Sequence, residues 1–340
     1  MVEVRMPLIS IVIVNYNGKK FLKDCLTSVL NTRYPNFEVI IVDNGSRDGS
    51  VDFIKREFGR NKRLKIIPLD KNYGLTYAIN VGVSKSKGEY IACLDNDVKV
   101  TPRWLNGLIF FMFSNPDVAV VQPKLLFLNK RNIIDGTGDF PTIYGFPLRP
   151  RGQLEPDKGQ YDEKHDIFSA RGAAFLIRKK VFYEVGEMDS DFFFHLNDID
   201  LGWRVRLRGY RIAYVPTSIV YHNVHGTLKD IDPYDSTFHH YKNVIVMLIK
   251  NYETKNLLKY VGVPLIILTG GLIKDVLTKK RRIPIARCKA IMWIIKNFRK
   301  IWLKRLNVQL NVRRICDDQI KKHMIKKMRF SFFNSGKGRK

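Results

Sequence analysis

The chain has 340 residues, of which 45% are apolar, so it can bury a sizeable core in one large domain or two smaller ones. Its formal net charge of +27 is unevenly spread, because residues 240–340 contain 26 Lys and Arg against 4 Asp and Glu. A region this basic suits a polyanionic partner, such as nucleic acid, an anionic membrane or a phosphate-bearing substrate.

The cysteines and the N-terminus exclude several classes of protein. Four cysteines are scattered without a CxxC pair, which argues against a disulfide framework or a zinc site and favours a reducing compartment. The apolar run at residues 8–14 is too short for a membrane span and has no signal-peptide cleavage site. We therefore expect it to be the first strand of a sheet.

Apolar strands and helices alternate through the first hundred residues. The expected strands are residues 9–14, 37–42, 64–69 and 90–94, and the expected helices are residues 21–32, 51–58 and 77–86. Near-continuous apolar strands that alternate with helices indicate a mostly parallel sheet with helices on both faces. This is a Rossmann-like α/β fold.

Polar clusters follow three of these strands. They are Asn15-Tyr16-Asn17, Asp43-Asn44 and Asp95-Asn96-Asp97. Ligands of such sheets bind at the carboxyl ends of the strands, so we expect the three clusters to meet at one edge.

Two carboxylates, Asp95 and Asp97, end the fourth strand one residue apart. Alternate residues of a strand face the same side, so the pair could bridge Mg²⁺ or Mn²⁺ to a diphosphate. A solvated turn is the plainer alternative.

The other clusters suit a nucleotide, although no GxGxxG follows the first strand. Tyr16 could offer its ring to a base, and Asp43 could accept a hydrogen bond from an imide N–H. Asn72, Gly74 and Asn80 belong to the next candidate segment, where ordinary turn and cap chemistry is an equal alternative.

Five segments together resemble the family-2 glycosyltransferases of the GT-A fold, close to their rhamnosyltransferase-like branch. The resemblance covers about the first 230 residues. The matching segments are SIVIVNYNG (10–18), VIIVDNGSRDGS (39–50), NYGLTYAINVG (72–82), the DxD-type LDND (94–97) and FFFHLNDIDLGWRVRLRGY (192–210).

The resemblance implies transfer of a sugar from a nucleoside diphosphate with Mn²⁺ or Mg²⁺ as cofactor. The residues it assigns to the nucleotide are Asn15, Tyr16, Asn17, Asp43, Asn72, Gly74, Asn80, Asp95 and Asn96. The residues it assigns to the metal are Asp95, Asp97 and His222, with His225 as the rival of His222. A histidine after the last strand is, without this resemblance, more often a packed or surface residue.

The same resemblance assigns the general base to Asp198. Asn197 replaces the Glu that the family usually has before this Asp, and Asp200 is expected to pair with Arg204 one helical turn later. One base facing a metal-held leaving group indicates single displacement with inversion.

An acceptor or sugar site is expected after residue 123. Residues 124–168 are rich in turns, which is typical of a lid or substrate flap. Arg171, Gly172, Ala173 and Asn197 are the acceptor- or sugar-binding candidates, although the small residues could equally serve close packing of two elements.

We expect a domain at residues 1–235, divided at residue 123 into a nucleotide-sugar half and an acceptor half. Residues 236–340 form a basic, apolar helical region. Its longest uncharged run, Tyr260 to Ile273, has 14 residues, short of the ~20 of a spanning helix. Trp293 and Trp302 among Lys, Arg, Ile and Leu favour helices lying in an anionic membrane interface; a helical bundle or a homo-oligomer interface is the alternative.

The sequence thus predicts an inverting, metal-dependent glycosyltransferase at the cytoplasmic face of the cell membrane, peripherally attached. The donor is expected to carry UDP or dTDP, and the acceptor to be a lipid-linked or cell-envelope glycan. The alternative is a nucleic-acid- or anionic-lipid-binding protein that uses the basic tail. No nucleic-acid motif is present in the tail, so nucleic acid is not expected as a partner.

Overall fold

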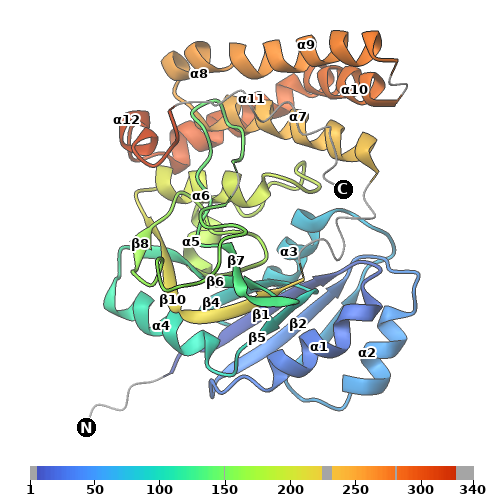
Figure 1. The fold of residues 1–340 in the computed structure, drawn as a ribbon, viewed down its shortest axis with the longest axis vertical. Coiled ribbons are helices and arrows are strands. Elements are labelled where there is room, and N and C mark those ends of the chain that lie inside the picture. Colours follow the sequence, from blue (N-terminus) through green and yellow to red (C-terminus); the bar gives the residue numbers. More distant parts are fainter. Residues whose placement is uncertain (1–5, 149, 224–231, 280–281, 327–340) are drawn as a thin grey trace.

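The chain forms an α/β fold with one large mixed β-sheet, and a layer of C-terminal helices lies over it (Figure 1). The computed structural model describes residues 6–148, 150–223, 232–279 and 282–326. Within them ten strands form the sheet, in the order β3-β2-β1-β4-β9-β6-β10-β5, with β7 on β6 and β8 on β10. The strands are β1 (Ile9–Asn15), β2 (Phe37–Asp43), β3 (Leu64–Pro68), β4 (Tyr90–Asp95), β5 (Val98–Val100), β6 (Val118–Phe127), β7 (Lys130–Gly136), β8 (His165–Asp166), β9 (Ala174–Arg178) and β10 (Arg211–His222).

The first four strands are parallel, as the sequence predicted. Strand β1 pairs with β2 and β4, and its last residue, Asn15, lies opposite Asp43 of β2. Strand β9 then runs antiparallel between β4 and β6, so the second half of the sheet is mixed. The carboxyl ends of β1, β2 and β4 consequently meet at one edge.

Helices cover both faces of this sheet. The helices are α1 (Lys19–Leu30), α2 (Ser50–Phe58), α3 (Leu75–Ser84), α4 (Trp104–Ser114), α5 (Lys179–Glu184) and α6 (Asn197–Leu207). Helices α1, α2 and α4 share one core cluster with alternate β1 residues such as Ile11, while α3, α5 and α6 share the opposite cluster with Val12. The period-two burial explains why the strands are apolar on both faces.

The basic C-terminal region is helical. Its helices are α7 (Pro233–Asn251), α8 (Thr254–Tyr260), α9 (Gly262–Leu277), α10 (Arg282–Lys296), α11 (Phe298–Asn307), a π-helical turn (Val308–Val312) and α12 (Asp317–Lys321). Asp232 caps α7 by accepting a hydrogen bond from the backbone N–H of Tyr234 (2.9 Å), and Pro233 occupies the first helical position.

Helix α7 packs directly on the body. A third core cluster joins Phe168, Trp203 and Leu207 of the body to Met247, Leu248 and Tyr252 of the C-terminal region. Residues on both sides of the predicted boundary at residue 235 therefore share one hydrophobic core.

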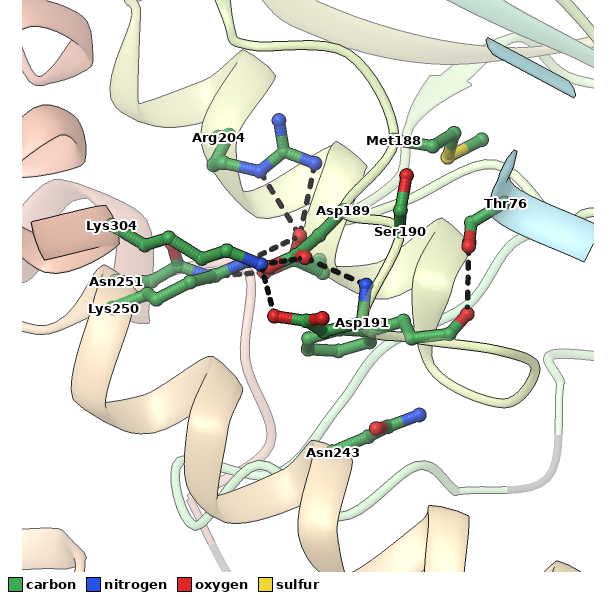
Figure 2. Close-up of polar contacts among 12 residues, drawn as sticks. Thr76, Met188, Asp189, Ser190, Asp191, Arg204, Asn243, Lys250, Asn251 and Lys304 are labelled. Atoms are coloured by element: carbon green, nitrogen blue, oxygen red, sulfur yellow. Dashed lines mark hydrogen bonds and ion pairs between the residues drawn. The ribbon is translucent and has the colours of Figure 1, made fainter. Parts of the chain in front are cut away.

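A buried ion cluster fastens the two parts together (Figure 2). The Asp200 carboxylate accepts hydrogen bonds from Arg204, Lys250 and Asn251, each at 3.0 Å, which confirms the predicted Asp200–Arg204 pair. Lys250 also pairs with Asp189, as does Lys304. Burial alone would raise the pKa of Asp189, but the two lysines hold it well below its usual range.

The outer helices α8–α11 leave many large apolar side chains exposed. They are Leu258, Leu265, Ile266, Ile273, Val276, Leu277, Ile285, Met292, Ile295, Phe298, Trp302, Leu303 and Leu306. Within the described ranges one helical stretch, Thr254–Leu277, is long and apolar enough to cross a membrane, with 24 residues and a mean hydropathy of 1.6 over an 18-residue window. The membrane-crossing criterion concerns length and composition alone. The stretch is longer than the uncharged run of Tyr260 to Ile273 because it also includes charged residues.

Lys250→Met should lower the free energy of unfolding by about 3–5 kcal/mol, because it leaves Asp189 and Asp200 with less compensation inside the protein. Urea denaturation measures this change. Lys300→Met is the matched control, since Lys300 pairs with Asp191 while 55% exposed, and such a pair contributes about 0–1 kcal/mol. Equal effects of the two substitutions would contradict the structural role of the cluster.

Candidate active site

The predicted polar clusters meet in one cavity of about 1010 Å³ between the sheet edge and helices α6 and α7. Twelve of the predicted residues line it. They are Tyr16, Asn17, Asn72, Asp95, Asn96, Asp97, Arg171, Gly172, Ala173, Asn197, Asp198 and His222. Sequence reasoning thus brought together side chains that are up to two hundred residues apart.

Asn15 and Asp43 lie just beneath the cavity and do not line it. Asn96 Nδ2 donates to Asn15 Oδ1 (2.7 Å), and Asn15 Nδ2 donates to Asp43 Oδ1 (2.8 Å), so the three strand ends are linked by a chain of buried hydrogen bonds. A Cβ on Gly18 would lie 1.9 Å from Asn96 Nδ2, which explains the glycine of NYNG. This series of hydrogen bonds holds in place the loop that carries Tyr16 and Asn17.

Asn44 was not among the predicted site residues, yet it lines the cavity and organises the loop after β3. Its Nδ2 donates to Asn72 Oδ1 (2.9 Å), and its Oδ1 accepts from the Tyr73 N–H (3.0 Å). Gly74 has a positive φ of 92°, and a Cβ there would collide with Phe193, so glycine is required at this position. Gly74 itself is not part of the cavity lining.

Asn80 points away from the cavity. Its side chain donates to the Met188 carbonyl (2.8 Å) and accepts from the Met188 N–H (3.0 Å). These contacts attach helix α3 to the loop before α6.

Asp95, Asp97 and His222 form a group that could hold a divalent ion. One potential ligand atom from each lies within 4.8 Å of the others. Oxygen-rich ligands suit Mg²⁺ and Mn²⁺, and imidazole is acceptable to Mn²⁺. Burial and the neighbouring Asp97 raise the pKa of Asp95 to about 7, as expected for crowded carboxylates without a cation. His225 lies outside the described residues.

Another carboxylate, Asp135, lies outside this group and orients the His222 ring. His222 Nδ1 donates to Asp135 Oδ2 at 2.8 Å, leaving Nε2 3.5 Å from Asp97 Oδ1. Burial alone would lower the pKa of His222, but Asp135 and Asp97 raise it to about 9. Arg171 also contacts Asp135, by a hydrogen bond from Nη1 to its carbonyl (3.1 Å). Asp135 lies in the turn-rich segment 124–168 and was not singled out from the sequence, because its partner His222 is 87 residues away.

Asp198 is the second residue of α6, whose first residue, Asn197, directly follows two residues with positive φ, His195 (63°) and Leu196 (62°). Its Oδ2 accepts from the Gly172 N–H (3.0 Å) and its Oδ1 from the Ile199 N–H (2.9 Å). Burial raises the pKa of Asp198 despite these hydrogen bonds. A raised pKa brings a carboxylate closer to the range useful for a general base.

Asp139 is a further carboxylate in the lining that the sequence analysis missed. Burial and the nearby Asp198 raise the pKa of Asp139 to about 7. Its backbone pairs with Ser169, which places it beside the Arg171 loop. No sequence motif marks it, because the pairing of the two loops is a tertiary contact.

The C-terminal region also contributes to the cavity. Asp232, Asp235, His239 and His240, from the cap and first half of α7, are part of its lining. The sequence had assigned every ligand-binding residue to positions before 236.

Comparison with known proteins agrees with this geometry. Residues 10–186 match the family model described as "Glycosyl transferase family 2". The poly-beta-1,6-N-acetyl-D-glucosamine synthase of Staphylococcus epidermidis is 28% identical over 222 residues, which are 65% of this chain and 51% of the synthase. The chain thus spans about half the length of that relative.

Two solved structures show the same fold. GalNAc-T7 with UDP, GalNAc and Mn²⁺ superposes with a TM-score of 0.60 at 19% identity, over 75% of this chain and 49% of GalNAc-T7. The mannosyltransferase PcManGT from Pyrobaculum calidifontis, in complex with GDP-Man and Mn²⁺, has a TM-score of 0.53 at 12% identity, over 90% of this chain and 87% of its own. Together with the family match, these likenesses establish that the chain belongs to glycosyl transferase family 2 and is a glycosyltransferase with the GT-A fold.

Proposed function

We propose that this glycosyltransferase is inverting and metal-dependent, and that it moves a sugar from a UDP or dTDP donor to a lipid-linked or cell-envelope glycan. One observation carries the proposal. The cavity that contains the Asp95, Asp97 and His222 group also contains Asp198, a carboxylate with a raised pKa. A leaving-group site and a base therefore share one enclosure.

Asp95, Asp97 and His222 would hold Mn²⁺ or Mg²⁺. The ion would supply positive charge to the diphosphate as it leaves. Asp135 supports this assignment, because it fixes the His222 ring so that Nε2 is directed to Asp97.

Asp198 accepts the proton of the acceptor hydroxyl. As that proton leaves, the hydroxyl oxygen forms a bond to the anomeric carbon. The bond from the anomeric carbon to the diphosphate oxygen breaks, and its electron pair leaves with the diphosphate. A single displacement of this kind inverts the anomeric configuration.

The nucleotide would lie over the ends of β1 and β2. Tyr16 is 39% exposed and offers its ring to a base, while Asn17, Asn44 and Asn72 supply amides to the same part of the lining. The relatives support a nucleoside-diphosphate sugar as donor, since their structures were solved with UDP or GDP-Man. Asp43, the residue behind the expected uracil or thymine preference, is buried just below this surface, where its carboxylate accepts hydrogen bonds from Asn15 and Ser46, so it does not itself line the base site.

We place the enzyme peripherally on the cytoplasmic face of a membrane, docked through helices α8–α11. The support is the exposed apolar side chains of these helices, which alternate with exposed lysines and arginines such as Lys259, Lys274 and Lys289. Apolar side chains flanked by basic ones suit the interface of an anionic bilayer. The inward side of the same region packs on the body, so membrane docking and bundle packing are compatible.

Asp97→Ala should abolish Mn²⁺-dependent binding of UDP, because the ion loses a carboxylate that no neighbouring side chain in the described structure replaces. Isothermal calorimetry with UDP, with and without Mn²⁺, measures the effect. Asp52→Ala, an exposed carboxylate on α2, is the control and should bind as the wild type does. Unchanged affinity in Asp97→Ala would refute the metal assignment.

Asp198→Asn should lower turnover by roughly 10²–10⁴-fold while UDP and Mn²⁺ still bind, because the amide keeps the shape but cannot take the proton. Turnover is measured as UDP release from a panel of UDP-sugars, and the anomeric configuration of the product by NMR. Asp139→Asn is the matched comparison, since both carboxylates line the cavity. A larger loss in Asp139→Asn than in Asp198→Asn would move the base role to Asp139.

Full-length protein should float with vesicles that contain phosphatidylglycerol, less so as salt rises, because salt screens the basic side chains but not the apolar contacts. The double variant Ile266→Ser/Leu277→Ser should float less at every salt concentration. Phe110→Ser is the control, because Phe110 is an exposed side chain of α4. Protein that stays soluble with anionic vesicles at low salt would exclude the membrane surface as a partner.

A further inference from the structure

Five rings form one wall of the cavity, on the side of α6 and α7. They are Phe193, Phe194, His195, His239 and His240, and we call them the ring wall. Phe193 stacks on His239, with centroids 5.3 Å apart and planes at 24°. Phe194 contacts both His195 (4.5 Å) and His239 (4.7 Å). The wall is therefore continuous from the loop before α6 to α7.

Helix α7 holds this wall in place. The buried Asn243 side chain donates from Nδ2 to the carbonyls of Phe194 and His195, both at 2.8 Å. A hydrogen bond of 3.0 Å joins His195 Nε2 to Ser236 Oγ. These contacts fix the positive-φ turn of His195 and Leu196, which ends two residues before Asp198. The wall is thus a built surface, assembled from two parts of the chain.

The three histidines of the wall are neutral near pH 7. Burial lowers the pKa of His195 and of His240 to about 4 and, with Lys242 nearby, that of His239 to about 3. Among the described lining residues the lysine and arginine side chains are Lys20 and Arg171, and neither lies on α7. Asp232 and Asp235 lie at the α7 end of the lining. The cavity side of this wall therefore offers apolar faces, imidazole nitrogens and carboxylates, while the nearby Lys242, 3.5 Å from His239 Nδ1, is not part of the lining.

These features suit a sugar better than a phosphate. A pyranose ring has a face of C–H groups, which packs on aromatic rings, and hydroxyls at its rim, which donate to carboxylates and imidazoles. A phosphate would instead need cations or backbone N–H groups. Phe194 and His195 precede Asp198 by four and three residues and line the same cavity, so a sugar on the wall would share that cavity with the Asp198 carboxylate.

We propose that the ring wall is the acceptor subsite and that it binds a neutral pyranose unit of a glycan, with α7 as an integral part of the active site. The inference rests on the proposed function, because it takes Asp198 as the base. It selects a neutral saccharide over a phosphate-containing polymer as the part of the acceptor nearest the reaction.

Saturation-transfer NMR on the full-length protein with UDP and Mn²⁺ tests the proposal, with cellotriose and chitotriose as neutral probes and a glycerol-phosphate oligomer as the anionic probe. At least one trisaccharide should receive saturation on its ring C–H protons, and more than the glycerol phosphate does. Phe194→Leu and His239→Leu should each weaken trisaccharide binding by roughly three- to tenfold, the usual worth of an aromatic contact.

Phe110→Leu is the matched control, because Phe110 is an exposed ring on α4. The two wall variants lie on different elements, and their thermal midpoints in UDP and Mn²⁺ verify that each is folded. The proposal is overturned by any of three results: no trisaccharide binds, both folded variants bind as the wild type does, or the glycerol phosphate binds better. Failure of the proposed function is a separate result, since it would remove the Mn²⁺-dependent UDP binding of the wild type.

Discussion

Burial of helix α6 on both sides is the constraint on which the rest of the structure depends. Leu201 and Val205 face the sheet, whereas Trp203 and Leu207 face the C-terminal helices. A helix enclosed in this way carries Asp200 into the interior, where a lone carboxylate would be very unfavourable. Arg204 alone pairs with it along the helix, and Lys250 and Asn251 complete its hydrogen bonds from α7. The same contacts therefore fix α7 against α6 and, with it, the start of α6 where Asp198 lies.

The lining of the cavity contains more carboxylates than positively charged side chains. Asp95, Asp97, Asp139 and Asp198 all contribute to its lining, and burial, together with the neighbouring carboxylates, raises the pKa of Asp95 and of Asp139. His222 and Arg171 offset part of this negative charge, and Asp135 in turn orients both. A divalent cation between Asp95 and Asp97 would offset much of the rest. The carboxylates that would bind the cation are thus the same groups whose mutual repulsion the cation would relieve.

The C-terminal helices have two unlike sides. Toward the body, α7 supplies apolar side chains, the lysine of the ion cluster and two rings of the cavity wall. Helices α8 and α9 form the layer farthest from the sheet (Figure 1), and α8–α11 expose apolar and basic side chains. Under the proposed function, a region with this division would bring the proposed acceptor side of the active site close to a membrane-bound glycan. The strongly basic composition of residues 240–340 thus serves packing inside the protein as well as charge on its surface.

The sequence by itself determined the parallel strands, the family and twelve of the residues that line the cavity. Apolar runs of five to seven residues determined where β1, β2 and β4 lie, and alternation placed Asp95 and Asp97 on one side. Only the tertiary structure decided the roles of Asp135, Asp139 and His239, because their partners are distant in the chain and no local period marks them. It also placed Asp43 beneath the cavity and α7 beside it. Side-chain periodicity is a local property, whereas burial, shifted pKa values and shared walls arise only when separate segments pack together.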